Sequence, residues 1–177
     1  MIAACMSDLH GNLPDLSHLN FDVLLIGGDI CPVTNHTDRF QADWLDTIFR
    51  MWIGHIKAPV VAVAGNHDFV FDRNPGMVPS LPWTYLQDSG TTLPNGMRAW
   101  GSPHQPYFGG WAFNLHQDDF IDELAEKWDM IPADTDVLLL HGPLPLLNTY
   151  NGPELYCTIS LLLKRFFHYF YECKKNP

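Results

Sequence analysis

The sequence predicts a layered α/β protein, and three observations lead to this class. Short apolar runs alternate along the chain with longer amphipathic segments, which is the pattern of strands and helices packed in layers. The length of 177 residues is about that of one domain, and 46% hydrophobic and 13% aromatic content is enough for a folded core. The chain has no repeat, low-complexity segment or clear linker. We therefore expect a single domain over residues 1–177.

Four apolar runs are expected to form strands that are buried on both faces. They lie at residues 2–6, 23–26, 60–63 and 137–140. Between the second and the third run, apolar residues recur every three or four positions, which predicts a helix over about residues 37–57. The apolar side of this helix is formed by Phe40, Trp44, Ile48, Met51, Trp52 and Ile56.

The rest of the chain predicts a second sheet and a further helix. Residues 69–115 are rich in Pro and Gly and contain short pieces, at 84–86 and 97–100, that suit a small set of antiparallel strands. Residues 118–128 begin with acidic side chains and carry one apolar side, which predicts a helix. That side consists of Phe120, Ile121, Leu124 and Trp128.

Charge and cysteine usage limit the classes of function. Ten Lys and Arg against 20 Asp and Glu give a formal charge of −10, which disfavours a protein that coats nucleic acid by neutralising phosphates. No apolar run reaches the ~18 residues of a transmembrane helix. The four cysteines show no CxxC spacing and no secretion signal precedes them, so we expect a cytoplasmic protein with reduced thiols. Accordingly, we interpret the glycosylation sequon at residues 35–37 as a chance match.

Each predicted strand ends in a short polar cluster that can bind metal. Because ligands collect outside the carboxyl ends of strands in open α/β sheets, the four clusters are expected to converge on one site. Asp8 and His10 lie two residues apart and can reach one cation, while the two oxygens of Asp29 can bridge two cations. Asn66 and His141 complete a mixed oxygen and nitrogen set without thiolate, which suits Mn²⁺, Fe or Zn²⁺.

Taken singly, each cluster has a simpler explanation as a helix cap, a turn or a core histidine. Their occurrence together, each directly after an apolar run, favours a site. The other common catalytic templates are absent, since the chain contains no G-x-x-x-x-G-K-[ST], G-x-S-x-G or H-E-x-x-H motif.

The strand-end motifs resemble the successive motifs of the calcineurin-like metallophosphoesterases. They are Asp8-Leu9-His10-Gly11, Gly27-Gly28-Asp29, Gly65-Asn66-His67-Asp68 and His141-Gly142. A looser likeness, at residues 101–103 and 111–113, is to the small class III phosphodiesterases within that family. The resemblance implies a four-layer α-β-β-α sandwich, a dinuclear metal centre, and hydrolysis of small phosphodiesters or phosphomonoesters, with cyclic nucleotides as candidate substrates.

The resemblance also implies a role for each motif residue. Two side chains bind the first metal, one bridges both metals, two bind the second metal, and a histidine and an aspartate serve catalysis without binding metal. Asp8 and His10 would bind the first metal, and Asn66 and His141 the second. Asp29 would bridge the two metals. His67 would be the catalytic histidine, and Asp68 would orient it. His67 would donate a proton to the leaving oxygen or stabilise charge in the transition state.

The metal pair explains how an acidic protein can handle phosphate. Metals about 3.5 to 4 Å apart can activate a bridging water and hold the attacking and leaving oxygens. Two divalent ions against the carboxylates of Asp8 and Asp29 leave a formal charge of roughly +2, so the site can attract a phosphate.

The C-terminal part of the sequence departs from the family pattern. The family supplies two further histidine ligands from a Gly-His-x-His motif, which this sequence lacks. In one alignment, residues 166–170 form the strand that precedes the missing motif. Glu172 then replaces one of the missing histidine ligands, and His168 is a weaker candidate for such a ligand. In the other, residues from about 144 onward are a replaced, truncated or frameshifted end with a helical apolar side. The members of that side are Leu155, Ile159, Leu162, Phe166 and Phe170.

Two expectations result from this departure. The fold is expected to be incomplete at its C-terminal end, and the second metal site to be the weaker one. The alternative to a working enzyme is therefore a catalytically weak or inactive metal-binding relative, or a fragment that lacks two ligands. The loops around Trp83, His104 and Trp111, which would set specificity, are irregular and do not indicate which phosphoester is used.

Overall fold

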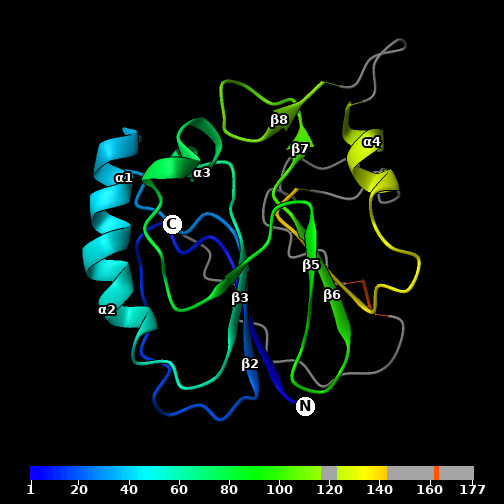
Figure 1. Ribbon diagram of the computed structural model, residues 1–177. Helices are drawn as coiled ribbons and strands as arrows, with labels where there is room; N and C mark the ends of the chain where they lie inside the picture. Colours follow the sequence, from blue (N-terminus) through cyan, green and yellow to red (C-terminus); the bar gives the residue numbers. More distant parts are fainter. Residues whose placement is uncertain (117–122, 143–161, 164–177) are drawn as a thin grey trace, which may run out of the picture.

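The computed structural model of the chain describes residues 1–116, 123–142 and 162–163. Within these residues, two four-stranded sheets stand side by side, with helices on the outer side of each (Figure 1). Expectations that fall on residues 143–161 and 164–177, including those for His168 and Glu172, lie outside the described residues. No helix in the described part of the chain is long and apolar enough to cross a membrane.

The first sheet is parallel throughout and has the strand order β1-β2-β3-β4. Its strands are β1 (Ala3–Met6), β2 (Val23–Gly27), β3 (Val60–Val63) and β4 (Thr84–Tyr85). The prediction that residues 84–86 join the second sheet is wrong, because β4 pairs with β3 in parallel. β2 and β3 are buried as predicted, whereas β1 is only half-buried, because it has a strand neighbour on one side among the described residues.

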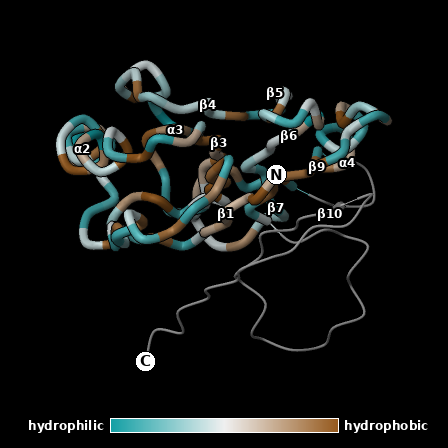
Figure 2. Tube along the Cα trace, turned by 90° about the horizontal axis from the view of Figure 1, so that it is seen from below, coloured by the Kyte–Doolittle hydropathy of each residue, from teal (hydrophilic) through white to brown (hydrophobic). Residues whose placement is uncertain are grey.

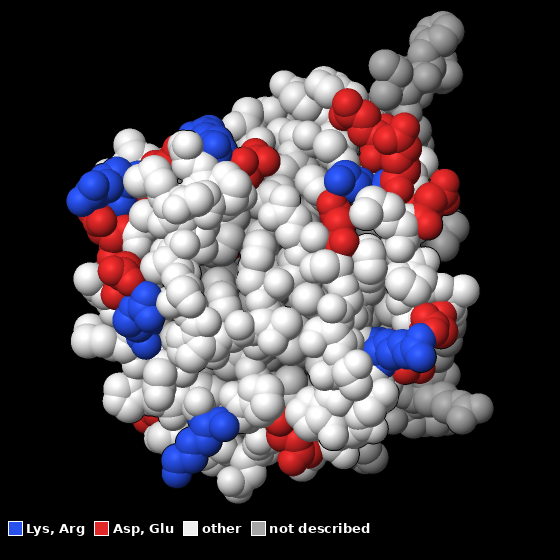
Figure 3. Space-filling model, viewed as in Figure 1, with Lys and Arg blue, Asp and Glu red and all other residues white. Residues whose placement is uncertain are grey.

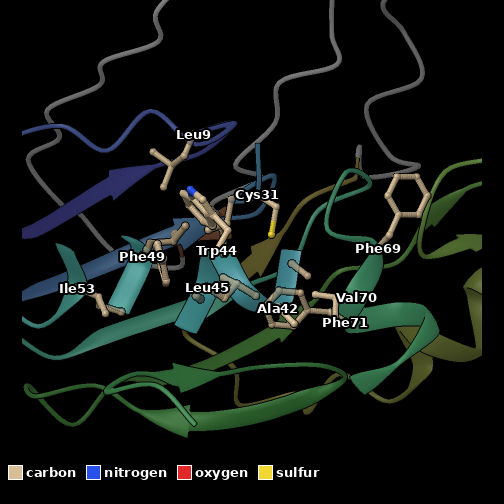
Figure 4. Close-up of a cluster of buried hydrophobic side chains, with 14 of the residues drawn as sticks. Leu9, Cys31, Ala42, Trp44, Leu45, Phe49, Ile53, Phe69, Val70 and Phe71 are labelled. Atoms are coloured by element: carbon tan, nitrogen blue, oxygen red, sulfur yellow. The ribbon is translucent and has the colours of Figure 1, made fainter. Parts of the chain in front are cut away.

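One helical segment covers the outer face of this sheet. It consists of α1 (Asp38–Trp44), the π-helical turn η1 (Leu45–Phe49) and α2 (Arg50–Ile53), and thus confirms the predicted helix over these residues. The predicted apolar side is partly wrong, since Ile48 is 49% and Met51 63% exposed. A π turn holds one more residue than an α turn and rotates the next helical turn about the axis, so Phe49 and Ile53 face the core instead. Figure 4 shows both side chains in the buried cluster.

The second sheet is mixed and has the order β10-β9-β6-β5. Its strands are β5 (Ser89–Thr92), β6 (Arg98–Ser102), β9 (Val137–Leu140) and β10 (Leu162–Leu163). β5 and β6 are antiparallel, as predicted, while β9 runs parallel to β6. β10 pairs with β9 in an antiparallel register, so the helical interpretation is wrong at Leu162.

The remaining described elements are short. They are α3 (Phe69–Arg73), the 3₁₀ turn η2 (Pro75–Met77), the paired strands β7 (Gln105–Pro106) and β8 (Asn114–Leu115), and α4 (Glu123–Asp129). α4 confirms the second half of the helix predicted over residues 118–128, and its Leu124 is buried. Residues 117–122 lie outside the described part.

Alternation along the central strands produces the layers. In β2, Val23 and Leu25 belong to the apolar cluster between the two sheets, while Leu24 and Ile26 belong to the cluster under the helices. Burial of one such side chain contributes about 1.5–3 kcal/mol, so both faces of β2 hold neighbouring layers. Figures 1 and 2 show the order from α2 through the two sheets to α4, which is the predicted α-β-β-α sandwich.

Candidate metal centre

The first three strands of the parallel sheet deliver their polar loops to one edge. The loops after β1 and β2 continue beyond the strands as a backbone ladder. The Asp8 N–H donates to Gly28 O at 3.0 Å, and the His10 N–H donates to Asp29 O at 2.8 Å. Because of these bonds, Asp8 and His10 lie directly beside Asp29.

Three of these residues adopt an unusual backbone conformation. Asp8, His10 and Asp29 have φ values of 55°, 45° and 54°. L-residues with side chains rarely occupy this left-handed region, and such strain tends to gather at functional sites. Asp88 and Phe113 also have positive φ values, but Asp8, His10 and Asp29 are the three that lie together at the strand ends.

Asp29 occupies the centre of the site and faces two groups of possible ligands. One group joins Asp29 to His10 and His67, and the other joins it to Asp8 and His141; within each group the ligand atoms lie within 4.8 Å of one another. Asp29 Oδ2 is 3.6 Å from His10 Nε2, and Asp29 Oδ1 is 3.4 Å from His141 Nε2. A side chain shared by two groups is what a bridging ligand requires, although Asp8 lies in the group with His141 and not in the one with His10.

Two glycines make room for these side chains. Gly28 has a φ of +99°, and a Cβ there would lie 2.6 Å from His141 Nδ1. A Cβ at Gly65 would overlap the carboxylate and the backbone nitrogen of Asp29. The glycines of both motifs thus serve close approach as well as turning.

His141 comes from β9 of the second sheet, so the site lies where the ends of the two sheets meet. Its Nδ1 is 2.8 Å from Gly27 O, which can only accept a hydrogen bond. Nδ1 therefore carries a proton, and in the neutral form of this ring Nε2 presents a lone pair. That atom faces the acceptor oxygen Asn66 Oδ1 at 2.9 Å. A cation between these two lone pairs would satisfy both.

The electrostatics of Asp29 also fit a bound metal. The side chain is only 4% exposed, and burial raises its pKa to about 7. His141 pulls this pKa down, while the neighbouring Asp68 carboxylate pushes it up. A buried carboxylate in this state lacks a strong positive partner, which a divalent ion supplies.

His67 is held beside Asp29 by contacts along its whole length. Its N–H donates to Asp29 Oδ1 at 2.8 Å, and its carbonyl accepts from Gln41 Nε2 at 2.7 Å. Its ring Nδ1 lies 3.3 Å from His36 Nε2, and its ring centroid is 4.2 Å from that of Trp111. Burial lowers the pKa of His67 to about 4, and the nearby rings of His10 and His36 add to this effect.

Asp68 is fully buried, and its hydrogen bonds go to the backbone. Its carboxylate accepts N–H groups from Ile30 at 3.0 Å, from Cys31 at 2.8 Å and from Gly65 at 2.8 Å. Ile30 is the residue after Asp29, so Asp68 fixes the loop that carries the central carboxylate. Its contacts differ from the expected one, in which Asp68 orients the His67 ring.

Sequence reasoning missed two residues next to the site, His36 and Gln41. Gln41 was detectable as a polar position among apolar neighbours of α1, and it is completely buried. His36 had no such signal, because it lies in an irregular loop and forms part of a sequence that matches a glycosylation sequon.

A family model described as calcineurin-like phosphoesterase matches residues 1–170. The chain belongs to this family. The resemblance drawn from the four motifs is thereby confirmed. Members of the calcineurin-like phosphoesterase family generally bind divalent metals, in agreement with the donor set around Asp29.

Curated relatives match 78% of the chain. The human metallophosphoesterase domain-containing protein 1 is 30% identical over 165 residues, which cover 78% of this chain and 47% of the human protein. The UPF0046 protein T07D4.2 of Caenorhabditis elegans is 29% identical over 174 residues, covering 78% of this chain and 41% of that protein. The chain thus spans less than half the length of these two relatives.

Proposed function

We propose that this calcineurin-like phosphoesterase hydrolyses small phosphodiesters or phosphomonoesters with two divalent ions, Mn²⁺, Fe or Zn²⁺, at a dinuclear centre. The observation that carries the proposal is the position of Asp29. Its Oδ2 lies 3.6 Å from His10 Nε2 and its Oδ1 lies 3.4 Å from His141 Nε2, so each oxygen faces a proposed ligand of a different ion. One buried carboxylate shared in this way is the element that a two-metal hydrolase needs.

The proposed ligands are those predicted from the motifs. In the assignment that the resemblance implies, Asp8 and His10 would hold the first ion, Asn66 and His141 the second, and Asp29 both, whereas the distances place Asp8 nearer to His141 than this assignment expects. Ions bound there would polarise the phosphoester and activate the attacking water. Five side chains are shared between two ions, so we expect one ion to bind well and the second, held by Asn66 and His141, to bind more weakly.

His67 is the proposed catalytic residue, and Asp68 is a positioning residue that acts through the Asp29 loop. His67 Nε2 points to the centre, 4.0 Å from Asp29 Oδ2. An Nε2–H there can donate a hydrogen bond that stabilises the negative charge developing on the leaving oxygen as the bond to phosphorus breaks. Asp29 and Gln41 bind the backbone of residue 67 and place its ring beside the centre.

An aromatic side chain beside the centre supports substrates that carry a ring, such as cyclic nucleotides. Trp111 packs on His67, with the two ring centroids 4.2 Å apart. Flat apolar faces of this kind suit stacking on a base or an aryl group.

On the face shown in Figure 3, Lys and Arg are scattered singly, so the described residues there form no basic track for nucleic acid. We place the protein in the cytoplasm, in keeping with the free thiols of Cys5 and Cys31.

The experiment combines elemental analysis with a rate measurement. The full chain is loaded with Mn²⁺ and given bis(4-nitrophenyl) phosphate. We expect two ions per chain, and we expect His67→Ala to retain them while losing about 10²- to 10⁴-fold in rate. His55→Ala is the matched control, because this exposed histidine lies at the end of α2, where its Nδ1 contacts Met51 O.

The outcomes separate the proposal from its alternative. An unchanged rate in His67→Ala would show that the role assigned to this histidine is wrong. A single ion per chain without hydrolysis would favour the weak or inactive metal-binding relative.

A further inference from the structure

We propose that His36 is a positioning residue that sets the ring orientation and the tautomer of His67. The inference rests on the proposed function, in which His67 Nε2–H donates a hydrogen bond to the leaving oxygen and stabilises its developing negative charge. It adds a residue that lies outside the four family motifs. It is carried by a direct contact between the two imidazole rings.

The loop that holds His36 is ordered by its own contacts. His36 lies between Asp29 and α1, and the neighbouring Asn35 Oδ1 accepts the Thr37 N–H at 2.9 Å. The His36 ring is half-buried, with its centroid 4.9 Å from the ring of Phe69 and 5.8 Å from that of Trp111. Aromatic packing on both neighbours leaves its Nε2 aimed at His67 Nδ1.

The backbone and the ring of His67 are held by different groups. Asp29 and Gln41 bind the backbone N–H and C=O of residue 67 and leave rotation of the ring free. The Asp68 carboxylate is taken up by backbone amides. In the part of the chain that the structure describes, His36 is the side chain whose hydrogen bond reaches the Nδ1 of this ring.

The direction of this bond has a chemical consequence. When His36 donates from Nε2, His67 Nδ1 is the acceptor and the proton of neutral His67 must sit on Nε2. That is the nitrogen that faces Asp29 and the metal centre. Without a donor at Nδ1, the ring can adopt the other tautomer, which presents a lone pair to the leaving oxygen and cannot donate to it.

Two amide substitutions distinguish this role from simple packing. Glutamine places its side-chain nitrogen close to the position of a histidine Nε2, whereas asparagine is one methylene shorter. We therefore expect His36→Gln to keep the donor at His67 Nδ1 and His36→Asn to lose it. Thermal unfolding of both variants checks that the fold is retained.

The first readout is the tautomer itself, from nitrogen-15 spectra of the histidine rings. The spectra are recorded on the full chain without metal and with diamagnetic Zn²⁺. We expect the Nε2–H tautomer of His67 in the wild type and in His36→Gln, and a mixture of tautomers in His36→Asn. A wild-type His67 with its proton on Nδ1, or the same tautomer in all three proteins, would overturn the proposal.

The second readout is the dependence of rate on the leaving group. With diaryl phosphates, His36→Asn is expected to lower kcat about 10- to 100-fold with little change in KM or in metal content. The loss should be larger for a phenyl than for a 4-nitrophenyl leaving group, because more negative charge develops on the phenolate oxygen and the hydrogen bond from Nε2–H stabilises it more. His36→Gln should recover most of the rate; equal losses for both leaving groups would contradict the role.

The two readouts keep the two proposals apart. A wild type that hydrolyses nothing, but whose His67 tautomer responds to His36→Asn, overturns the proposed function and supports the positioning contact. An active wild type whose tautomer is indifferent to residue 36 overturns the positioning role and leaves the function standing.

Discussion

Two buried aspartates in this fold have opposite electrostatic environments. The Asp88 side chain, which lies just after β4, is 10% exposed and accepts hydrogen bonds from Ser102 Oγ at 2.7 Å, His104 Nε2 at 3.0 Å and Lys127 Nζ at 2.8 Å. Burial alone would raise the pKa of Asp88, but these donors hold the pKa well below its usual range. Burial raises the pKa of Asp29 to about 7, because His141 offsets it only in part.

The difference in electrostatic environment indicates a structural role for Asp88 and a metal-binding role for Asp29. Asp88 finds its positive partners within the chain, so it ties the β4–β5 turn to α4 and serves stability. Asp29 lies beside His10 and His67, whose pKa values are lowered, and near other carboxylates, so a divalent ion from solution would balance its charge. Replacing each aspartate by asparagine, which keeps the shape and removes the charge, tests this contrast in both directions.

The largest effect is expected on metal affinity. Asp29→Asn should weaken Mn²⁺ binding by more than the roughly 100-fold typical of an outer-shell change, because it removes a shared ligand. Asp88→Asn, which lies outside both ligand groups, should bind Mn²⁺ within about twofold of the wild type. Titration calorimetry on the full chain measures both. Equal losses in the two variants would break the contrast.

The next effect is on stability, and here Asp88→Asn rather than Asp29→Asn is expected to show the larger change. In EDTA at pH 7, Asp88→Asn is expected to lower the free energy of unfolding by about 2 kcal/mol, because Lys127 and His104 lose a charged acceptor. The Lys127 side chain is 31% exposed, and water limits the loss. Asp29→Asn should leave this stability unchanged or higher, as urea unfolding monitored by tryptophan fluorescence would show. A destabilised Asp29→Asn would mean that its charge is already balanced.

The smallest effect is the pH dependence of stability in the metal-free chain. The folded pKa of Asp29, about 7, lies above its ordinary value of 3.8, so its contribution is present below about pH 4 and is lost as pH rises through 7. Relative to Asp29→Asn, the wild type should lose about 1–2 kcal/mol between pH 5 and 7. Taking this difference between the two proteins removes most of the opposite contribution of His67, whose pKa is lowered.

Two comparisons check the sign of this pH dependence. The depressed pKa of Asp88 contributes stability above about pH 4 that is lost on further acidification, so Asp88→Asn should reduce acid sensitivity. With saturating Mn²⁺, the difference in unfolding free energy between the wild type and Asp29→Asn should increase as pH rises from 5 to 7, because the ion competes with protons for the same oxygens. A wild type that parallels Asp29→Asn over pH 5–7 would contradict the raised pKa.

The sequence predicted the parts of the site that depend on local patterns. Asp29 and His141 were predictable because each comes directly after an apolar run, and the carboxyl ends of such runs meet in space. The contacts that tune the site were not predictable in this way. Asp68 reaches Ile30 across 38 positions, and His36 reaches His67 across 31, without any periodicity to reveal them.

The errors in the fold also have physical causes. The side of the helix that faces the sheet was predicted from an α-helical period, and the π turn at Leu45–Phe49 changes that period. β4 has two residues, too few for a pattern to show which sheet it joins. Polar residues at strand ends can thus be predicted from this sequence more readily than contacts between distant loops.

The close approach of Gly65 to Asp29 has a consequence for how this site can be lost. Any side chain at position 65 would compete with the Asp29 carboxylate for the same volume. The sheet around it is held by apolar layers that do not depend on that volume. Replacement of Gly65 by alanine, a single added methyl group, would therefore remove the metal site and retain the fold. Position 65 is thus a point at which related proteins can lose activity without losing their structure.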